Sequence, residues 1–330
     1  MLNMKNCKKQ KNEIDISIII VSWNTKDCLR NCLNLIYDTI HEFKFEVIVI
    51  DNGSRDGSPL MVEKDFPQAM LIQSGSNLGF SGANNIGIEK SRGRYFALIN
   101  SDIEVMEGCI DSLCAFMDKK FKVGIVGPRI LNPDMSIQPS CYGYPTYWNS
   151  LIHALGINKL NLKTILRTSI YEKYIKCEKT QSVDILSGCF WIIRKETLDE
   201  VGLLDDNFFF GWEDFDLCKR FHLVGWDVVY IVEAVAIHYG QRSSLIDPTR
   251  FIIESEKGHI QFWRKYHGNL GVIFITFVIL IRHILQYIKN TILFLIKPSQ
   301  RKTIKIQLKK NYALLHWFLF PCKNNKIETL

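Results

Sequence analysis

The sequence lacks several motifs that would each have identified a common class of enzyme. It contains no Cys-x-x-Cys pair, no G-x-G-x-x-G turn after its first predicted strand, and no G-x-x-x-x-G-K-[ST] loop. The first absence argues against a structural zinc site. The other two argue against dinucleotide-dependent oxidoreduction and P-loop phosphoryl transfer, because both chemistries cradle phosphate in those loops. Basic residues form no stripe with aromatic residues, so nucleic acid is not an expected partner.

The beginning of the chain also lacks a hydrophobic secretory core, because its first residues are polar and rich in lysine. The ten cysteines are scattered, which is typical of a reducing cytoplasm in which most cysteines act as small apolar residues. The formal charge of +7 is unevenly distributed, with bases at 5–11 and after Lys297 and carboxylates around 199–216. This asymmetry predicts an acidic cleft and chain ends that contact an anionic surface.

The C-terminal region has no apolar run long enough to span a bilayer without interruption. The run at 270–281 has twelve residues, whereas a spanning helix needs about 20. The longer segment 270–297 is strongly apolar but carries Arg282, His283 and Lys289. Three alternatives stay open: a buried terminal helix, helices at the membrane interface with these basic residues at the headgroups, or a true span.

Short β-branched apolar runs alternate with helix-like stretches along much of the chain. Helices are expected at 26–40 and 250–267, and residues 129–180 show no regular pattern. Near-continuous apolar strands separated by helices predict a mostly parallel sheet covered on both faces. The predicted strands are 16–21, 45–50, 69–73, 94–100, 123–128, the start of 183–196, 227–232 and 236–240.

Polar turns follow three of these strands, at 22–25, 51–58 and 100–102. Ligands of parallel sheets bind outside the carboxyl ends of the strands, so we expect the three turns to converge on one crevice. Taken singly, Asp51 and Asp102 could be turn formers or helix caps. Together they favour a binding site, because a strand-end carboxylate can hold a divalent cation that neutralises a substrate diphosphate.

Seven sequence blocks, in order, resemble the family 2 glycosyltransferases. They are "SIIIVSWN", "DNGSRDGS", "NLGFSGANNIGI", "ALINSD", "LSGCFWIIRKE", "FFFGWEDFDLCKRFHLVGW" and "AIHYGQRSS". The resemblance covers about residues 14–267 and extends to bacterial rhamnosyltransferase-like enzymes. It implies a GT-A fold, in which a Rossmann-like, mostly parallel sheet carries helices on both faces. The expected parts are a basic flexible N-terminus at 1–13, a glycosyltransferase domain at 14–267 with nucleotide-binding (14–128) and acceptor (129–267) halves, and an apolar, basic helical tail at 268–330 that associates with a membrane.

The resemblance also implies roles for individual residues of the donor site. Asp51 is expected to hydrogen-bond the pyrimidine base of the donor. The other residues expected to line the donor site are Ser22, Asn24, Asn77, Gly79, Asn100, Ser101 and Gly188. Arg242 is expected either to meet phosphate or to be an exposed surface arginine.

The turn Asn100-Ser101-Asp102 stands where the family has its Asp-x-Asp metal motif. Its first acid is asparagine here, which leaves Asp102 as the main carboxylate ligand for Mg²⁺ or Mn²⁺. His238 matches a family histidine that completes the metal shell. Considered alone, a histidine after an apolar strand is more often a satisfied core residue.

Asp214 matches the catalytic base of the family, which removes the proton of the acceptor hydroxyl. The positive end of a helix dipole at this point would keep its carboxylate ionised. Glu213 is expected to be a second base or an acceptor contact. Trp212 is expected either to stack on the acceptor sugar or to belong to the core, and Trp191 is expected in the core.

These expectations describe a metal-dependent inverting glycosyltransferase of bacterial surface-polysaccharide synthesis. Its donor would be dTDP-rhamnose or a UDP-sugar, and its acceptor a glycan or a polyprenyl-linked sugar at the cytoplasmic face of the cell membrane. The alternative is a catalytically inactive scaffold of the same fold that binds sugar nucleotides or glycans. Asn100 slightly favours that alternative, whereas Asp102, Asp214 and His238 oppose it.

Overall fold

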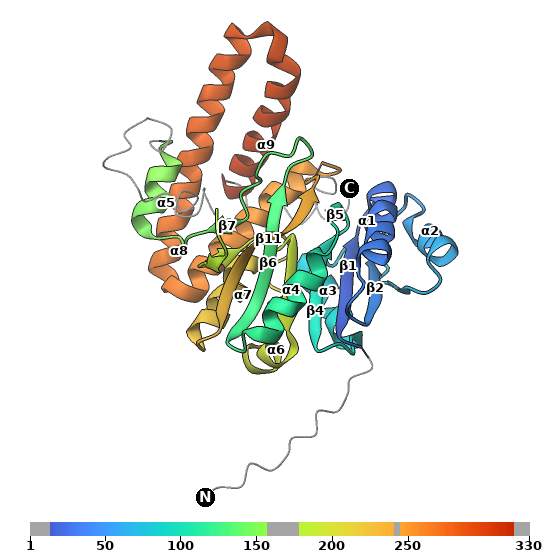
Figure 1. Ribbon diagram of the computed structural model, residues 1–330. Helices are drawn as coiled ribbons and strands as arrows, with labels where there is room; N and C mark the ends of the chain where they lie inside the picture. The colour runs from blue at the N-terminus through green and yellow to red at the C-terminus, as the bar shows by residue number, and fades with distance from the viewer. Residues whose placement is uncertain (1–13, 157–177, 241–244, 320–330) are drawn as a thin grey trace, which may run out of the picture.

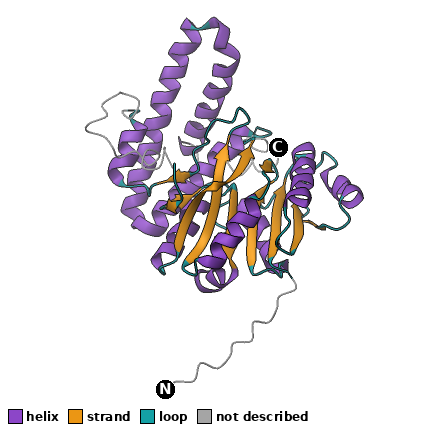
Figure 2. Ribbon diagram, viewed as in Figure 1, coloured by secondary structure: helices purple, strands orange, loops and turns teal. Residues whose placement is uncertain are grey.

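The computed structural model describes residues 14–156, 178–240 and 245–319. A nine-stranded sheet forms its centre, in the order β3-β2-β1-β4-β10-β6-β11-β5 with β8 paired to β11 (Figures 1 and 2). Its strands are β1 Ile16–Ser22, β2 Phe45–Asp51, β3 Met70–Gln73, β4 Tyr95–Asn100, β5 Ile103–Val105, β6 Val123–Leu131, β8 Gln181–Ser182, β10 Phe190–Arg194 and β11 Asp227–His238. A second sheet pairs β7 (Cys141–Tyr142) with β9 (Ile185–Leu186).

Helices cover both faces of the central sheet (Figure 2). On β1, Ile18 and Ile20 belong to one buried cluster with residues of α1 and α4, whereas Ile19 belongs to a second cluster with residues of α3. This two-sided burial confirms the predicted sheet with helices on both faces. The helices are α1 Lys26–Thr39, α2 Ser58–Asp65, α3 Gly79–Lys90, α4 Cys109–Lys119, α5 Tyr147–Ala154, α6 Lys195–Val201, α7 Glu213–Leu223, α8 Pro248–Ile296 and α9 Arg301–Leu319, with a 3₁₀ turn η2 at Pro298–Gln300.

Strands β3, β2, β1 and β4 are parallel, so their carboxyl ends lie at one edge of the sheet. The register pairs Ser22 with Asp51 and Val21 with Asn100. The polar turns that follow these strands therefore begin at the same level. This register agrees with the prediction from the sequence that the polar turns lie at one edge of the sheet.

Strand β10 enters the middle of the sheet antiparallel to both β4 and β6. Its residue Phe190 pairs with Ile99, so the loop before β10 lies beside the end of β4. The two segments predicted at 227–232 and 236–240 form one strand, β11, whose pairing with β6 is irregular between Ile231 and Val235. The sheet is therefore parallel at β3-β2-β1-β4 and at β6-β11, with antiparallel strands added at β10, β5 and β8.

The long helix α8 is interrupted at Gly268, whose φ of 63° and ψ of −161° are not helical. The break separates an inner stretch, 248–267, from an outer stretch, 269–296. The outer stretch and α9 run side by side and project from the sheet (Figure 1). We refer to residues 269–319 as the C-terminal hairpin. Among the described helices, α8 is long and apolar enough to cross a membrane, and 28% of its most apolar window is buried.

Two basic residues of the hairpin pack against the inner stretch of α8, whereas the membrane-interface alternative places them at lipid headgroups. His283 is 3% exposed, and the guanidinium of Arg282 forms an ion pair with Glu256 of the inner stretch. Both contact Glu256, an acidic residue of the same helix on the other side of the break, as the buried-helix alternative would have it. Lys289 is exposed, as a headgroup contact requires.

Candidate active site

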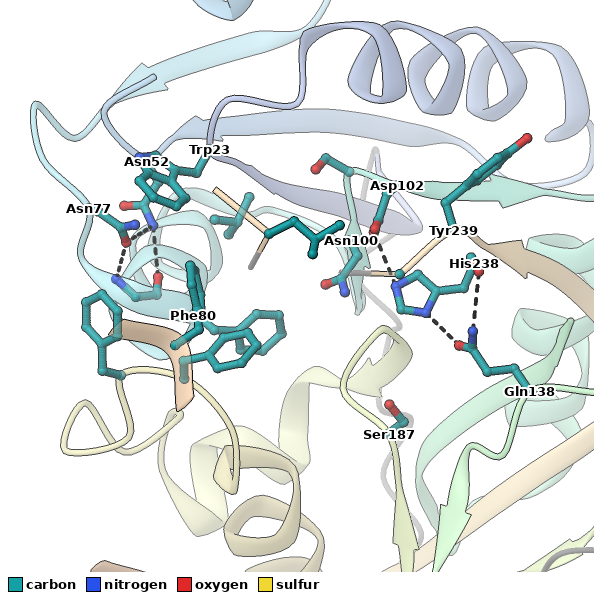
Figure 3. Close-up of a pocket in the computed structure, with 18 of the residues that line it drawn as sticks. Trp23, Asn52, Asn77, Phe80, Asn100, Asp102, Gln138, Ser187, His238 and Tyr239 are labelled. Carbon is teal, nitrogen blue, oxygen red and sulfur yellow. Dashed lines mark hydrogen bonds and ion pairs between the residues drawn. The ribbon is translucent and has the colours of Figure 1, made fainter. Parts of the chain in front are cut away.

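A cavity of about 780 Å³ opens where β1, β4 and β11 end (Figure 3). Six of the residues expected to bind a donor or a metal line it: Asn77, Gly79, Asn100, Ser101, Asp102 and, on the opposite wall, His238. The cavity is further lined by Val21, Trp23, Asn52, Phe80, Asn132, Gln138, Pro139, Tyr142, Ser187, Phe209, Phe210, Tyr239, Gly240, Leu245 and Phe251.

Asp102 and His238 face each other across the cavity floor (Figure 3). Asp102 lies in the turn between β4 and β5, and His238 is the last residue of β11, paired with Ile103 of β5. The antiparallel pairing of β5 with β11 brings Oδ1 of Asp102 to 3.2 Å from Nε2 of His238. Both side chains are largely buried, with 9% and 14% of their surface exposed.

Gln138 determines which ring nitrogen of His238 carries the proton. The amide nitrogen of Gln138 donates to Oδ1 of Asn132 at 2.8 Å, which leaves Oε1 as an acceptor for Nδ1–H of His238 at 2.7 Å. In the neutral imidazole, Nε2 then presents its lone pair to Asp102. Two electron-pair donors at 3.2 Å need a positive charge between them, either a proton or a cation.

This donor pair fits the divalent cation that the sequence suggests. Within the described residues, no group of three or more His, Cys, Asp and Glu side chains converges to form a complete protein cage. A complete cage is not required, because Mg²⁺ commonly uses one or two protein ligands and takes the remaining oxygens from water and substrate phosphates. Asp102 and His238 are therefore a sufficient pair if a phosphorylated ligand shares the site.

Asp51 lies at a neighbouring hollow of about 700 Å³, which shares Trp23 and Asn77 with the first cavity. Its carboxylate is 3% exposed, and Oδ2 accepts from the backbone N–H of Ser54 at 3.1 Å. Its other oxygen, Oδ1, is buried without a hydrogen-bond partner. Because a buried unpaired acceptor is costly, this oxygen is suited to accept an N–H from a ligand.

Gly79 holds the start of α3 close to the loop that contains Phe209. Its φ is +77°, and a Cβ there would lie 2.3 Å from the carbonyl oxygen of Phe209, so only glycine fits. The same carbonyl accepts from the N–H of Phe80 at 2.8 Å. Asn77 supports this turn, since its Oδ1 accepts from Gly79 N–H at 3.0 Å. Both residues therefore hold the backbone of the cavity wall in position.

Asp214 lies in the first turn of α7, close behind the wall of the large cavity. The N–H of Phe215 donates to its Oδ1 at 2.9 Å, and the N–H of Gly188 approaches its Oδ2 at 3.4 Å. Gly188 follows Ser187, which lines the cavity, and precedes Cys189, whose carbonyl accepts from the N–H of Asn100 at 3.0 Å. The short loop before β10 thus connects Asp214 to the end of β4.

The electrostatics of the same loop also connect the two acids. Burial raises the pKa of the Cys189 thiol, and the negative charges of Asp102 and Asp214 both raise it further. Both carboxylates therefore lie within electrostatic reach of one residue.

Burial raises the pKa of both acids at the start of α7. The effect is larger for Glu213, because the charge of Asp214 adds to the burial. For Asp214, the two backbone N–H groups oppose the burial and hold its pKa below that of Glu213. Glu213 is 8% exposed, and its Oε2 has no hydrogen-bond partner. Of the two, Asp214 is the acid that is ionised more readily near neutral pH.

Some expected site residues do not line the large cavity. Ser22 is fully buried, and its hydroxyl is 3.1 Å from Thr25, which in turn contacts Ser101. Asn24 lines the smaller hollow with Asp51. Trp212 packs on Phe215 and His259, and Trp191 is fully buried, as expected for a core residue. Arg242 lies outside the described residues.

The structure adds residues that the sequence did not single out. Gln138 lies in a segment without a regular pattern, so no sequence signal marked it. Asn52 follows Asp51 and donates to Asn77 at 3.0 Å, and its place inside a polar strand-end turn was the available signal. Phe210 and Phe251 form an edge-to-face pair in the cavity wall, with ring centroids 4.5 Å apart.

Fold and site together define a glycosyltransferase of the GT-A class: a Rossmann-like sheet with carboxylates at its strand ends and an acidic helix start beside them. The chain belongs to glycosyl transferase family 2, whose family model matches residues 17–202. This confirms the family inferred from the seven sequence blocks.

Relatives within the family include rhamnosyltransferases. The chain is 27% identical over 234 residues to the N-acetylglucosaminyl-diphospho-decaprenol L-rhamnosyltransferase of Mycobacterium tuberculosis, covering 68% of this chain and 76% of the relative. It is 26% identical to the rhamnosyltransferase WbbL of Escherichia coli K12, covering 76% and 92% of the two chains. A similar fold occurs in the mannosyltransferase PcManGT of Pyrobaculum calidifontis, solved with GDP-Man and Mn²⁺, with a TM-score of 0.50, 14% identity, and coverage of 96% and 88%.

Proposed function

We propose that this glycosyltransferase moves rhamnose from dTDP-rhamnose to a glycan or a polyprenyl-linked sugar, with inversion at the anomeric carbon, during synthesis of a bacterial surface polysaccharide. The observation that carries the proposal is the loop 187–189, which contacts Asp214 through Gly188 and Asn100 through Cys189, beside the pair formed by Asp102 and His238. The choice of rhamnose rests on the relatives from Mycobacterium tuberculosis and Escherichia coli, both named as rhamnosyltransferases.

The donor nucleotide fits the smaller hollow. The unpartnered Oδ1 of Asp51 would accept the ring N3–H of thymine or uracil, which cytosine lacks. The diphosphate would then extend through the region of Asn77 and Gly79 toward Asn100 and Asp102, which line the adjoining cavity. A donor bound in this way would have its sugar beside Ser187, next to the loop that contacts Asp214.

Asp102 and His238 would hold Mn²⁺ or Mg²⁺, and Gln138 would keep Nε2 of the histidine free for it. The cation, when bound, neutralises the charge that develops on the departing nucleoside diphosphate. Asn100 cannot add a second negative charge to this turn. The chain therefore depends on Asp102 for the carboxylate and on the histidine for the second ligand.

Asp214 would act as the general base. Its carboxylate takes the proton from the acceptor hydroxyl while the hydroxyl oxygen forms its bond to the sugar C1. The bond from C1 to the diphosphate oxygen breaks on the opposite face, so the configuration inverts. The N–H groups of Phe215 and Gly188 orient the two oxygens of Asp214, and the start of α7 favours its negative form.

The C-terminal hairpin would rest on the cytoplasmic face of the cell membrane. It carries eight Lys and Arg residues and no Asp or Glu. Its apolar side chains are exposed, among them Leu270 at 78%, Ile273 at 67% and Leu295 at 68%. Apolar groups together with bases suit an anionic lipid interface, where each base contributes about 1 kcal/mol. A spanning hairpin would carry its tip, with Lys297 and Lys302, across the bilayer against the positive-inside bias.

An assay with purified protein, dTDP-rhamnose and N-acetylglucosaminyl-diphospho-polyprenol would test the proposal. We expect transfer in the presence of Mn²⁺ or Mg²⁺, and inversion seen by NMR of the product. Asp214→Asn should lower kcat by roughly 10²–10⁴-fold, the size of a general-base effect, and leave nucleotide binding intact. Asp199→Asn, which changes an exposed carboxylate on α6, is the matched control and should retain full activity.

Full turnover by Asp214→Asn would remove this residue as the base. Binding of dTDP-rhamnose without turnover on any glycan or lipid-linked acceptor would instead favour the scaffold alternative. A panel that includes UDP-galactofuranose, UDP-glucose and UDP-N-acetylglucosamine decides the donor. Transfer of one of these sugars in place of rhamnose would keep the enzyme and overturn the donor assignment.

A further inference from the structure

A buried polar cluster lies where the C-terminal hairpin joins the catalytic domain. Glu256 of the inner stretch of α8 is its centre, and three other members surround it: Arg282, His283 and His259. The Arg282 guanidinium pairs with Oε1 of Glu256, Nε2 of His283 lies 3.3 Å from the same oxygen, and Nδ1 of His259 lies 3.3 Å from Oε2. In α9, Asn311 completes the cluster, with its Oδ1 2.8 Å from Nδ1 of His283.

The positive charge of Arg282 offsets that of the Glu256 carboxylate within this buried cluster. Burial alone would raise the pKa of Glu256, but Arg282 and hydrogen bonds from His259 and His283 outweigh it and hold the pKa well below its usual range. Burial lowers the pKa of His259, which is therefore neutral and donates Nδ1–H to the carboxylate. Its Nε2 has no hydrogen-bond partner, so this nitrogen contributes nothing to the cluster.

One face of the His259 ring contacts Trp212, the residue that precedes α7. Trp212 stacks on this ring with centroids 3.8 Å apart and planes 12° from parallel. Trp212 is the N-cap of α7, has a φ of +75°, and accepts from the N–H of Asp216 at 3.0 Å. Two residues beyond Trp212 is Asp214, so the position of the indole determines where the first turn of α7 begins.

The backbone in this region is packed too closely to move independently. A Cβ on Gly258 of α8 would lie 2.5 Å from the carbonyl oxygen of Gly211 and 3.4 Å from the Trp212 ring. The segment 211–212 is therefore held directly against α8, one residue before His259. Any tilt or rotation of this part of α8 would shift the start of α7 with it.

We propose that His259 is a positioning residue for the Asp214 carboxylate, held in place by the Glu256 cluster and thereby by the C-terminal hairpin. The proposal rests on the proposed role of Asp214 as general base. The ring of His259 fixes Trp212 by stacking, Trp212 fixes the first turn of α7, and Arg282, His283 and Asn311 orient the carboxylate that holds His259. The hairpin is thus part of the structure that sets catalytic geometry, in addition to any contact with lipid.

Two substitutions separate the stacking from the hydrogen bond. His259→Asn keeps a donor at the position of Nδ1 but removes the ring, whereas His259→Phe keeps a ring for Trp212 and loses the donor. We expect His259→Asn to lower kcat for transfer by roughly tenfold to a hundredfold, because small misplacements of a reacting group cost this much. His259→Phe should lower kcat less than His259→Asn does, because it keeps the ring that stacks on Trp212 and loses only the hydrogen bond to Glu256.

Three further measurements distinguish positioning from a general loss of structure. The KM for the donor and the Kd for the nucleotide should be unchanged in both variants, and the melting temperature should fall no further for His259→Asn than for His259→Phe. Arg264→Gln, at an exposed position on the same helix, is the matched control. Full kcat in His259→Asn, or equal losses of kcat in both variants, would overturn the proposal. Absence of transfer by the unsubstituted enzyme would instead overturn the proposed function.

Discussion

The side chain of Gln138 accepts a hydrogen bond at 2.7 Å from Nδ1 of His238, a residue 100 positions further along the chain. The contact fixes the imidazole tautomer that turns Nε2 toward Asp102. Gln138 is itself held in place, because its amide nitrogen donates a hydrogen bond to Oδ1 of Asn132. A neutral side chain far from the acidic motifs in the sequence therefore sets which ring nitrogen of His238 faces Asp102.

Gln138→Leu should weaken metal activation. Loss of the acceptor lets the ring rotate or adopt the other tautomer, and removing such a supporting residue costs about 10–100-fold in metal affinity. Titration of transfer activity with Mn²⁺ measures the effect as a higher concentration for half-activation. Gln138→Glu keeps an acceptor and should be affected less. Equal half-activation in all three proteins would contradict this role of the glutamine.

The dependence of the rate on pH should reveal the ionisation of Asp214. Burial raises its pKa to about 6, and the base works only when it is ionised. We expect kcat/KM to fall tenfold per pH unit below that pKa and to level off above it. Nucleotide affinity measured across the same range controls for titration of the donor. If kcat/KM instead began to fall only near pH 4, the usual pKa range of an aspartate, the pKa of Asp214 would be unperturbed.

Asp51→Ala should weaken binding of dTDP and UDP. The lost hydrogen bond to a charged acceptor is worth about 1.5–3 kcal/mol, which corresponds to a tenfold to hundredfold rise in Kd. Calorimetry with dTDP, UDP and CDP measures both affinity and discrimination. The unsubstituted protein should bind CDP more weakly, because cytosine has no N3–H, and this preference should shrink in the variant. An unchanged preference would place the base elsewhere.

Replacing four exposed lysines of the hairpin with glutamine should release the protein from anionic membranes. The four positions are Lys297, Lys302, Lys305 and Lys309. At about 1 kcal/mol for each, the partition coefficient should fall on the order of a thousandfold. Sedimentation with phosphatidylglycerol vesicles measures the loss, with phosphatidylcholine vesicles as the control. Activity on a water-soluble acceptor should be retained, because all four lysines are exposed and none belongs to the Glu256 cluster. Equal binding by both proteins would exclude electrostatic attachment.

The local pattern of the sequence was sufficient to predict the strands and turns of the first half of the fold. Strands such as Ile16–Ser22 and Phe45–Asp51 are runs of β-branched residues that end in polar turns, and parallel pairing brings those turns together. The pattern does not reveal the direction of a strand. The antiparallel insertion of Phe190–Arg194, which brings Gly188 to Asp214, could therefore not be predicted from it.

The missing parts of the site depend on pairings distant in sequence. Gln138 meets His238 only because β6 and β11 lie side by side in the sheet. Arg282 and His283 resembled headgroup contacts because their neighbours are apolar, and the partner that buries them, Glu256, precedes the helix break. Charge pairing over such separations has no local signature, whereas the strand-end acids Asp51 and Asp102 do.

The bend of α8 depends on a residue that has no side chain. Gly268 takes a backbone conformation that is essentially restricted to glycine, with φ of 63° and ψ of −161°. Any substitution there would favour a continuous helix and swing the distal arm to a new inclination. If the hairpin rests on a membrane as proposed, the cavity would then sit at a different height above that membrane, so this one position would set how far a lipid-linked acceptor must rise to meet the enzyme.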